Sequence, residues 1–311
     1  MDDFDTAPIV VLCQEGDIVV GHSLQRSLIA IRDLDENPGN PEDPKHRRLR
    51  HPGSNPGNNP DKRNEAMDIA TSPALYKRDF PAAFRAIRKL LANGDDTTQV
   101  FLIMRALNGP STPKNYARLL RTTSGRRLAY LRVELTERFS DPAFIASFAP
   151  GTLGAAYRSF LEETGYSATG LAKISNLDRE PLVEDPYAWL GRRTRDIHDI
   201  WHVLTGYKAD ENLGEAALVA FSYAQTGGLG WAFIAAATAL QSLRKTGNTA
   251  YLRAVVEGYR HGRKAKWLMA EDYETLLHEP LEAARARLGI LEPVLYQAAS
   301  KAAQCQPQGA A

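Results

Sequence analysis

The chain has 311 residues, of which 43% are hydrophobic and 24% are charged, and its formal net charge is +1. This length can bury one sizeable core with residues left over. The near-zero net charge excludes a global field that would recruit nucleic acid or a membrane. The two cysteines, Cys13 and Cys305, lie near opposite ends of the chain, which argues against a disulfide framework and suits a reducing cytosol.

The N-terminal part differs in composition from the rest. Residues 1–5 (MDDFD) are acidic and lack the features of a secretory signal or a mitochondrial transit peptide, so we expect a bacterial cytoplasmic protein. Residues 33–64 carry six prolines and almost no apolar side chains, and they cannot bury enough surface to offset their ordering entropy. We therefore predict an N-terminal extension with a linker, residues 1–70, and one folded domain, residues 71–311.

From Phe80 onward the apolar residues recur at the three-to-four spacing of helices that face a core. Two such helices end at Asn93-Gly94 and at Asn108-Gly109-Pro110. The pattern predicts further helices over residues 113–122, 125–138, 152–165, 184–205, 213–226, 229–244, 247–267 and 280–288. No pair of strands and no internal repeat stands out, so we predict a single, all-α, bundle-like domain.

The segment Ala216–Leu243 has no charged residue over 28 positions, a length that could span a bilayer. Polar residues and glycines interrupt its middle, and it is rich in alanine rather than leucine. We therefore predict two buried helices joined at Gly227-Gly228. Two alternatives stay open for their small side chains, namely close packing against neighbouring backbones or the border of an apolar cleft.

The segment His198-Asp199-Ile200-Trp201-His202 indicates a metal site. On a helix, His198 and His202 leave the same face, and their ring nitrogens can converge on one ion. Asp199 lies about 60° from His202 around the helix axis, and Glu215 would add a second carboxylate if the chain folds back. Ligands without sulfur suit one divalent metal ion such as zinc, iron, manganese or cobalt.

Spacing alone also allows a second interpretation, in which these residues are only the solvated face of an amphipathic helix. Glu215 has its own alternative as the third residue of a capping box that begins at Asn212. Gly191 and Gly206 fall on the same side as the histidines, where alanine would suit a solvated helix better. Their presence predicts that another part of the molecule approaches there closely.

The same motif carries a resemblance to a known family. From His198 through Leu213-Gly214-Glu215 to Gln225-Thr226-Gly227, the chain resembles the Coq4 family of ubiquinone (coenzyme Q) biosynthesis proteins, whose hallmark is H-D-x-x-H followed about a dozen residues later by E. The resemblance extends over about residues 76–295, with further matches in Gly151–Gly154 with Tyr157, Gly262-Arg263, Glu271–Glu274, Pro280-Leu281 and Leu288–Ile290.

The resemblance implies an all-α fold and one metal ion held by His198, Asp199, His202 and Glu215. Twelve residues rather than the usual eleven separate His202 from Glu215, and the extra one lies in residues 208–212. Because Gly262-Arg263 and Gln225-Thr226-Gly227 match the family, Arg263 and Gln225 become candidate substrate contacts.

The activity implied by the resemblance is a step of ubiquinone biosynthesis. The enzyme would remove the C1 carboxyl of a 4-hydroxy-3-methoxy-5-polyprenylbenzoate and leave a hydroxyl there, with His198, Asp199 and His202 as catalytic residues. The alternative is a non-catalytic, metal- and lipid-binding scaffold that gathers the other ubiquinone biosynthesis enzymes at the membrane. We expect a polyprenylated aromatic substrate or isoprenoid lipid as partner, peripheral contact with the cytoplasmic face of the inner membrane, a homo-oligomer and no nucleic acid.

Overall fold

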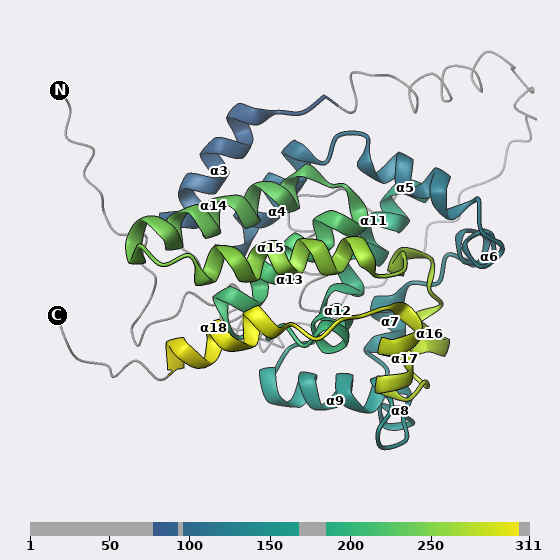
Figure 1. Ribbon diagram of the computed structural model, residues 1–311. Helices are drawn as coiled ribbons and strands as arrows, with labels where there is room; N and C mark the ends of the chain where they lie inside the picture. Colours follow the sequence, from purple (N-terminus) through teal and green to yellow (C-terminus); the bar gives the residue numbers. More distant parts are fainter. Residues whose placement is uncertain (1–76, 93–95, 168–184, 305–311) are drawn as a thin grey trace, which may run out of the picture.

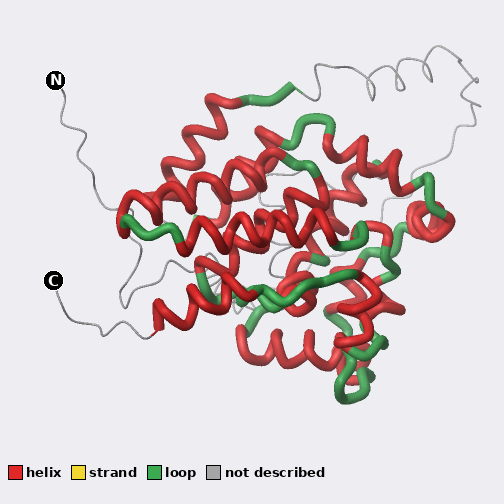
Figure 2. Tube along the Cα trace, in the orientation of Figure 1, coloured by secondary structure: helices red, strands yellow, loops and turns green. Residues whose placement is uncertain are grey.

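The computed structural model describes residues 77–92, 96–167 and 185–304, and every regular element in these ranges is helical (Figures 1 and 2). The prediction of an all-α fold is confirmed. Residues 1–76 lie outside the described residues, so the linker over residues 33–64 and the division at residue 70 stay predictions. The elements are α3 (Phe80–Ala92), α4 (Thr97–Leu107), α5 (Ser111–Leu119), α6 (Thr123–Leu131), α7 (Leu135–Phe139), α8 (Pro142–Ala146), α9 (Leu153–Thr164), α11 (Pro186–Asp196), α12 (His198–Thr205), α13 (Asn212–Thr226), α14 (Leu229–Thr246), α15 (Ala250–Lys264), the 3₁₀ turn η2 (Leu268–Ala270), α16 (Tyr273–Leu276), α17 (Leu281–Leu288) and α18 (Val294–Gln304).

Two of the predicted helices are each divided into two. The expected helix 125–138 is interrupted at Arg132, which adopts a left-handed conformation with φ 44° and ends α6. The expected helix 184–205 is interrupted at Ile197, whose backbone N–H bonds to the carbonyl oxygens of Arg193 and Arg195. α12 therefore begins at His198, the first histidine of the motif.

Helix α13 is the central element of the described fold and lies in the middle of Figure 1. One side of it contributes Ala217, Leu218 and Phe221 to a large hydrophobic cluster around α9, α11, α12 and α17. Ala216, Val219 and Ala220 belong to a second cluster with α3, α4 and α14. Because α13 is shared by both clusters, the position of its first turn is fixed from two sides.

Small residues let α15 lie directly against α13. A Cβ atom on Gly258 would fall 2.3 Å from the carbonyl oxygen of Ala217, and one on Gly262 would fall 2.6 Å from that of Phe221. These two glycines are one helical turn apart, so they form a backbone-to-backbone contact along the helix pair. The match of Gly262 to the family thus has a packing cause.

The uncharged segment Ala216–Leu243 forms two helices, as predicted, and Gly227 ends α13 with φ 67°. Among the described helices, none combines the length and apolar character needed to cross a membrane. α13 is buried along most of its length, whereas α14 exposes Ala236 and Leu240. The prediction of two buried helices is therefore confirmed for α13, whereas α14 is buried along one side.

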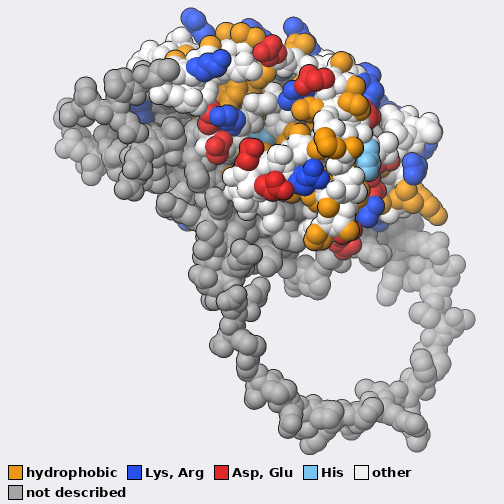
Figure 3. All heavy atoms as spheres, turned by 90° about the horizontal axis from the view of Figure 1, so that it is seen from below, with side chains coloured by type: hydrophobic (Ala, Val, Ile, Leu, Met, Phe, Trp, Pro, Cys, Tyr) orange, Lys and Arg blue, Asp and Glu red, His pale blue; other side chains and the backbone are white. Residues whose placement is uncertain are grey.

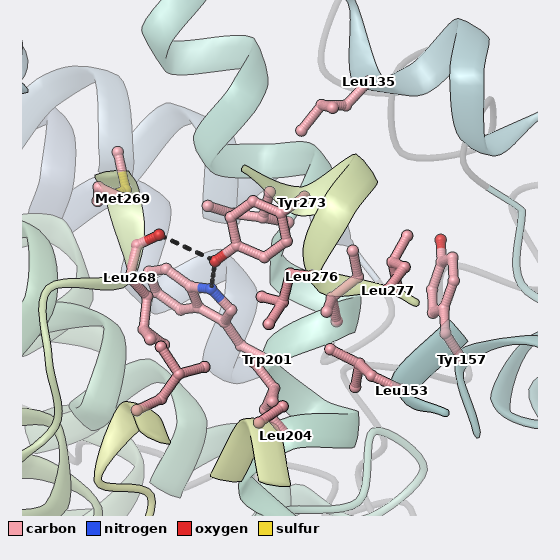
Figure 4. Packing of buried hydrophobic residues seen from close by; sticks show 14 of the residues in the cluster. Leu135, Leu153, Tyr157, Trp201, Leu204, Leu268, Met269, Tyr273, Leu276 and Leu277 are labelled. Carbon is pink, nitrogen blue, oxygen red and sulfur yellow. Dashed lines mark hydrogen bonds between the residues drawn. The ribbon is translucent and has the colours of Figure 1, made fainter. Parts of the chain in front are cut away.

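The core side of α12 is anchored by a chain of hydrogen bonds (Figure 4). The indole Nε1 of Trp201 donates to the hydroxyl of Tyr273 over 2.6 Å, and that hydroxyl donates to the carbonyl oxygen of Leu268 over 3.2 Å. At the other end of α12, Arg285 of α17 donates to the carbonyl oxygens of Val203 and Leu204, each over 2.9 Å. These contacts fix the rotation of α12, and so decide where its histidines point.

Candidate metal centre

The structure brings His198, His202 and Glu215 together, with one possible ligand atom from each residue within 4.8 Å of the others. Nε2 of His202 lies 3.3 Å from Oε1 of Glu215, and Nε2 of His198 lies 3.6 Å from Oε2. The His202 and Glu215 side chains are 1% and 8% exposed, whereas His198 is 17% exposed. The cluster is therefore buried on one side and reached from the His198 side.

The loop between α12 and α13 positions Glu215. Gly206 ends α12 with φ 75°, a conformation that glycine adopts readily. The chain then turns back, so that Gly214 lies against the backbone of Lys208. An added Cβ on Gly214 would fall 2.0 Å from the carbonyl oxygen of Lys208. This close approach explains why a glycine precedes Glu215 in the motif.

The capping-box interpretation of Glu215 is wrong. Helix α13 begins at Asn212 with Glu211 at the N-cap, and no side chain caps it. The Glu211 carboxylate instead accepts hydrogen bonds from Tyr296 and Ser300 of α18, each over 2.8 Å. The Glu215 side chain is thus free of a capping role and faces the histidines.

The two ring nitrogens of His202 have different roles. Nδ1 lies 2.7 Å from the carbonyl oxygen of Tyr207, which can only accept, so Nδ1 carries the proton. Nε2 is buried without a hydrogen-bond partner of acceptable geometry among the described residues. In the neutral ring, its lone pair would face the Glu215 carboxylate, an arrangement that is unfavourable without a cation between them. This donor set fits a divalent ion bound by imidazole nitrogen and carboxylate oxygen.

The pKa values of the pair agree with this electrostatic arrangement. Burial alone would lower the pKa of His202, but the nearby Glu215 carboxylate outweighs burial and raises it. Burial would also raise the pKa of Glu215, yet His202 and His198 lower it to about 2. Without a metal ion, a proton shared with His202 offsets the charge of Glu215, and a metal ion would take that place.

Asp199 lies beside this cluster but outside the three-residue group. It is only 4% exposed, and burial raises its pKa to about 6, an effect that His198 and His202 partly oppose. The expected role of Asp199 as a fourth ligand stays a prediction.

Aromatic side chains from two other helices flank the histidines. The ring of Trp231 in α14 is stacked on that of His198 with the centroids 5.7 Å apart, and Phe160 in α9 is stacked on His202 at 6.1 Å. Burial, together with the charges of Glu215 and Asp199, raises the pKa of Tyr166, which also contacts Phe160 edge-on. Sequence reasoning missed Phe160, Tyr166 and Trp231, because no local pattern links them to the motif.

The two candidate substrate contacts lie in different environments. Gln225 is buried, and its side chain donates to the carbonyl oxygen of Gly262 over 2.7 Å and accepts from the backbone N–H of Leu268 over 2.9 Å. Its amide is therefore occupied in holding α13 against α15 and η2. Arg263 is exposed on α15, and its role as a substrate contact stays a prediction.

The close approach expected at Gly191 and Gly206 is absent. Among the described residues, no atom lies within 4 Å of a Cβ built on Gly191, and for Gly206 the nearest is a side-chain carbon of Pro293 at 3.8 Å. Gly206 is required by its positive φ instead. The prediction failed because it assumed one continuous helix, whereas Gly206 lies just beyond the end of α12.

Comparison with known proteins identifies a family. The sequence model described as "Coenzyme Q (ubiquinone) biosynthesis protein Coq4" matches residues 82–294. The chain is 30% identical to a mitochondrial ubiquinone biosynthesis protein of Pyrenophora tritici-repentis over 190 residues. These residues are 60% of this chain and 62% of that protein. It is 31% identical over 164 residues to the mitochondrial homologue of Danio rerio, covering 51% of this chain and 57% of that one.

A third relative, from Neurospora crassa, is 28% identical over 177 residues, which is 56% of this chain and 48% of that protein. The chain thus spans about half to three fifths of the length of these relatives. A crystal structure of a protein named for ubiquinone biosynthesis from Nostoc punctiforme superposes with a TM-score of 0.52 at 24% identity, covering 69% of this chain and 99% of that one. This structural match supports the fold, and the sequence matches confirm the family resemblance.

Proposed function

Because the chain belongs to the Coq4 family of ubiquinone biosynthesis proteins, we propose that it catalyses a metal-dependent step on the aromatic head group of a ubiquinone precursor. The substrate is a 4-hydroxy-3-methoxy-5-polyprenylbenzoate, whose C1 carboxyl is replaced by a hydroxyl. Carbon dioxide leaves, one oxygen atom of dioxygen becomes the ring hydroxyl, and the other is released as water with two electrons and two protons from an external reductant. The observation that carries the proposal is the convergence of His198, His202 and Glu215, with one possible ligand atom from each within 4.8 Å of the others.

His198, His202 and Glu215 would hold one divalent ion, and Asp199 would be its fourth ligand. When bound, such an ion supplies Lewis-acid or redox chemistry at its open coordination positions. The carbonyl oxygen of Tyr207 keeps the proton on Nδ1 of His202, so Nε2 is available as a ligand. The greater exposure of His198 leaves the substrate side of the cluster accessible.

The neighbouring side chains suit an aromatic carboxylate. Trp231 and Phe160 offer ring faces beside the two imidazoles, against which a benzoate ring can stack. The Tyr166 hydroxyl stays protonated at neutral pH because burial and the nearby carboxylates raise its pKa, so it can donate a hydrogen bond to the ring carboxylate.

The scaffold alternative also has a supporting observation. The three grouped residues come from two helices joined by one loop, so an ion bound there would tie α12 to α13 even without catalysis. In that case the metal would matter for stability alone, and the partner enzymes would bind elsewhere.

Turnover of a short-tailed substrate separates the two roles. The protein, loaded with iron, manganese, cobalt or zinc under anaerobic conditions, is mixed with the prenylated hydroxybenzoate in oxygenated buffer that contains ascorbate as the electron donor, and carbon dioxide and the hydroxylated ring are measured. We expect product from the wild type and none from Asp199→Asn, with the exposed Asp210→Asn as the matched control. Equal rates for the wild type and Asp199→Asn, or no product with any metal, would favour the scaffold.

A further inference from the structure

The region from α4 to the end of α6 is strongly basic. Residues 97–133 contain no Asp or Glu, and seven basic side chains are distributed along them, namely Arg105, Lys114, Arg118, Arg121, Arg126, Arg127 and Arg132. The whole chain has a net charge of only +1. The positive charge is therefore concentrated in one part of a nearly neutral protein.

Helix α6 turns charged and apolar side chains to solvent together. Around its axis, at about 100° per residue, Arg126, Tyr130, Arg127 and Leu131 occupy one arc, and the buried Gly125, Leu128 and Ala129 occupy the opposite one. Tyr130 is 87% exposed and Leu131 is 51% exposed. In Figure 1, α6 lies at the edge of the molecule.

Few acidic groups lie near the exposed arginines of α6. Asp272 lies 3.7 Å from Nη1 of Arg127, which remains 71% exposed. Arg126 donates to the carbonyl oxygen of Leu120 and to the Thr123 hydroxyl, each over 3.3 Å, and neither of these partners carries a negative charge. Arg132 closes the helix in a left-handed conformation that residues other than glycine rarely adopt.

Helix α6 is also held rigidly. The hydroxyl of Thr122 accepts from the backbone N–H of Gly125 over 2.9 Å. A Cβ on Gly125 would fall 2.1 Å from the carbonyl oxygen of Leu119, so the start of α6 lies directly against the end of α5. The exposed arc is thus a fixed surface of the fold.

We propose that this α6 surface, defined by Arg126, Arg127, Tyr130 and Leu131, docks the protein on an anionic phospholipid bilayer. Arginines next to an exposed tyrosine and leucine match the boundary between headgroups and acyl chains, where both kinds of side chain are satisfied. The proposal rests on the proposed function, because a polyprenylated substrate resides in the bilayer. By contrast, the face in Figure 3 intermixes basic, acidic and hydrophobic side chains in the part that is coloured.

Vesicle co-sedimentation tests the proposal with the full chain. At low salt we expect binding to vesicles of phosphatidylcholine and phosphatidylglycerol (3:1), little binding to phosphatidylcholine alone, and release as salt is raised. Arg126→Gln with Arg127→Gln should lower the partition coefficient about 25-fold, since each basic residue near an anionic surface contributes about fivefold. Tyr130→Ser should also lower the partition coefficient, and the remaining binding should still be released as salt is raised.

The matched control is Arg244→Gln with Arg253→Gln, which removes the same charge from two exposed arginines of α14 and α15. The hairpin between these helices lies at the opposite end of the view from α6 in Figure 1. Equal loss in the control, undiminished binding of the α6 variant, or no binding by the wild type would overturn the proposal. A lower molecular mass of Tyr130→Ser in solution would instead identify α6 as a contact between copies and would also overturn it.

Turnover of a short-tailed, soluble substrate by the α6 variants keeps this proposal separate from the proposed function. We expect unchanged metal content and unchanged turnover in these variants. If docking fails while turnover persists, the inference about α6 is wrong and the proposed function stands. If docking holds while the wild type has no turnover, the inference about α6 stands and the proposed function is wrong.

Discussion

His202 shows which properties of the site a sequence contains. Helical periodicity is local, so the shared face of His198 and His202 could be predicted. The tautomer of His202 could not, because it is set by the carbonyl oxygen of Tyr207, beyond the end of the helix. Phe160 and Trp231 also escape sequence reasoning, since they reach the imidazoles from separate helices whose packing is a tertiary property.

The buried Asp199 yields a prediction about stability. Asp199→Asn should raise the free energy of unfolding of the metal-free protein at pH 7–8 by about 2–3 kcal/mol. The native state raises the pKa of this carboxyl to about 6 from its usual 3.8. Between pH 3.8 and about pH 6, the folded chain therefore binds more protons than the unfolded chain, and native stability falls as pH rises through this range. Above it, the full difference remains. Asparagine removes the buried charge.

Urea unfolding in the presence of a chelator, repeated from pH 3 to pH 8, measures this effect. The gain should shrink as pH falls from 6 and vanish at about pH 3, where the carboxyl is protonated in both states. Asp210→Asn, at an exposed position, should change little at any pH. A destabilised Asp199→Asn protein at pH 7 would contradict the assignment of a strained, buried charge.

At the scale of elements, periodicity predicted where most helices lie but not where they break. The interruptions at Arg132 and Ile197 carry neither glycine nor proline, so no local signal marks them. Helix α18 was missed because Tyr296 is its one buried residue, so no apolar periodicity marks the helix in the sequence. The loop between α12 and α13 matters most for the site, and its conformation depends on the contact between Gly214 and Lys208.

Gly214→Ala should disturb this loop. The added methyl group would fall 2.0 Å from a carbonyl oxygen, so the loop must shift, at a cost of about 1–3 kcal/mol. Because Glu215 is the next residue, metal affinity should fall by at least about tenfold. Calorimetric titration with zinc and urea unfolding measure the two effects.

Gly191→Ala is the matched control for Gly214→Ala. No described atom lies within 4 Å of its added Cβ, and Gly191 lies inside α11. Alanine should therefore stabilise the protein by up to about 1 kcal/mol and leave metal affinity unchanged. Equal zinc affinity in both variants would mean that the loop contact does not position Glu215.

Tyr273→Phe tests the anchoring of α12 on its core side. The change leaves the indole N–H of Trp201 and the carbonyl oxygen of Leu268 without this partner, and the free energy of unfolding should fall by about 1–3 kcal/mol. Tyr130→Phe, at an exposed position, should have no effect on unfolding. If Tyr273→Phe unfolds like the wild type, the hydrogen-bond chain does not stabilise α12.

At the scale of the whole molecule, composition and pattern were sufficient for the fold class, because an all-α chain needs only local periodicity. They were not sufficient for the arrangement of the helices, in which α13 joins both hydrophobic clusters. Because Glu215 lies in the first turn of α13, the site and the centre of the core share one element. Metal binding should therefore stabilise the entire domain.

Zinc at about 100 times its dissociation constant should add about 2.7 kcal/mol to the free energy of unfolding. For a chain of this size, the melting temperature should rise by about 5–10 °C. Differential scanning calorimetry with and without zinc measures the shift, and His202→Ala should show none. A shift of the same size in His202→Ala would indicate a site elsewhere on the chain.

The central claim, that His198, His202 and Glu215 hold one divalent ion, is tested most directly by elemental analysis of protein purified in metal-replete medium. We expect about one ion per chain in the wild type and far less in His202→Ala and Glu215→Gln. Circular dichroism should show retained helix content in both variants, because the core side of α12 is untouched and Glu215 caps no helix. A metal-free wild type, or unchanged metal content in both variants, would contradict the claim.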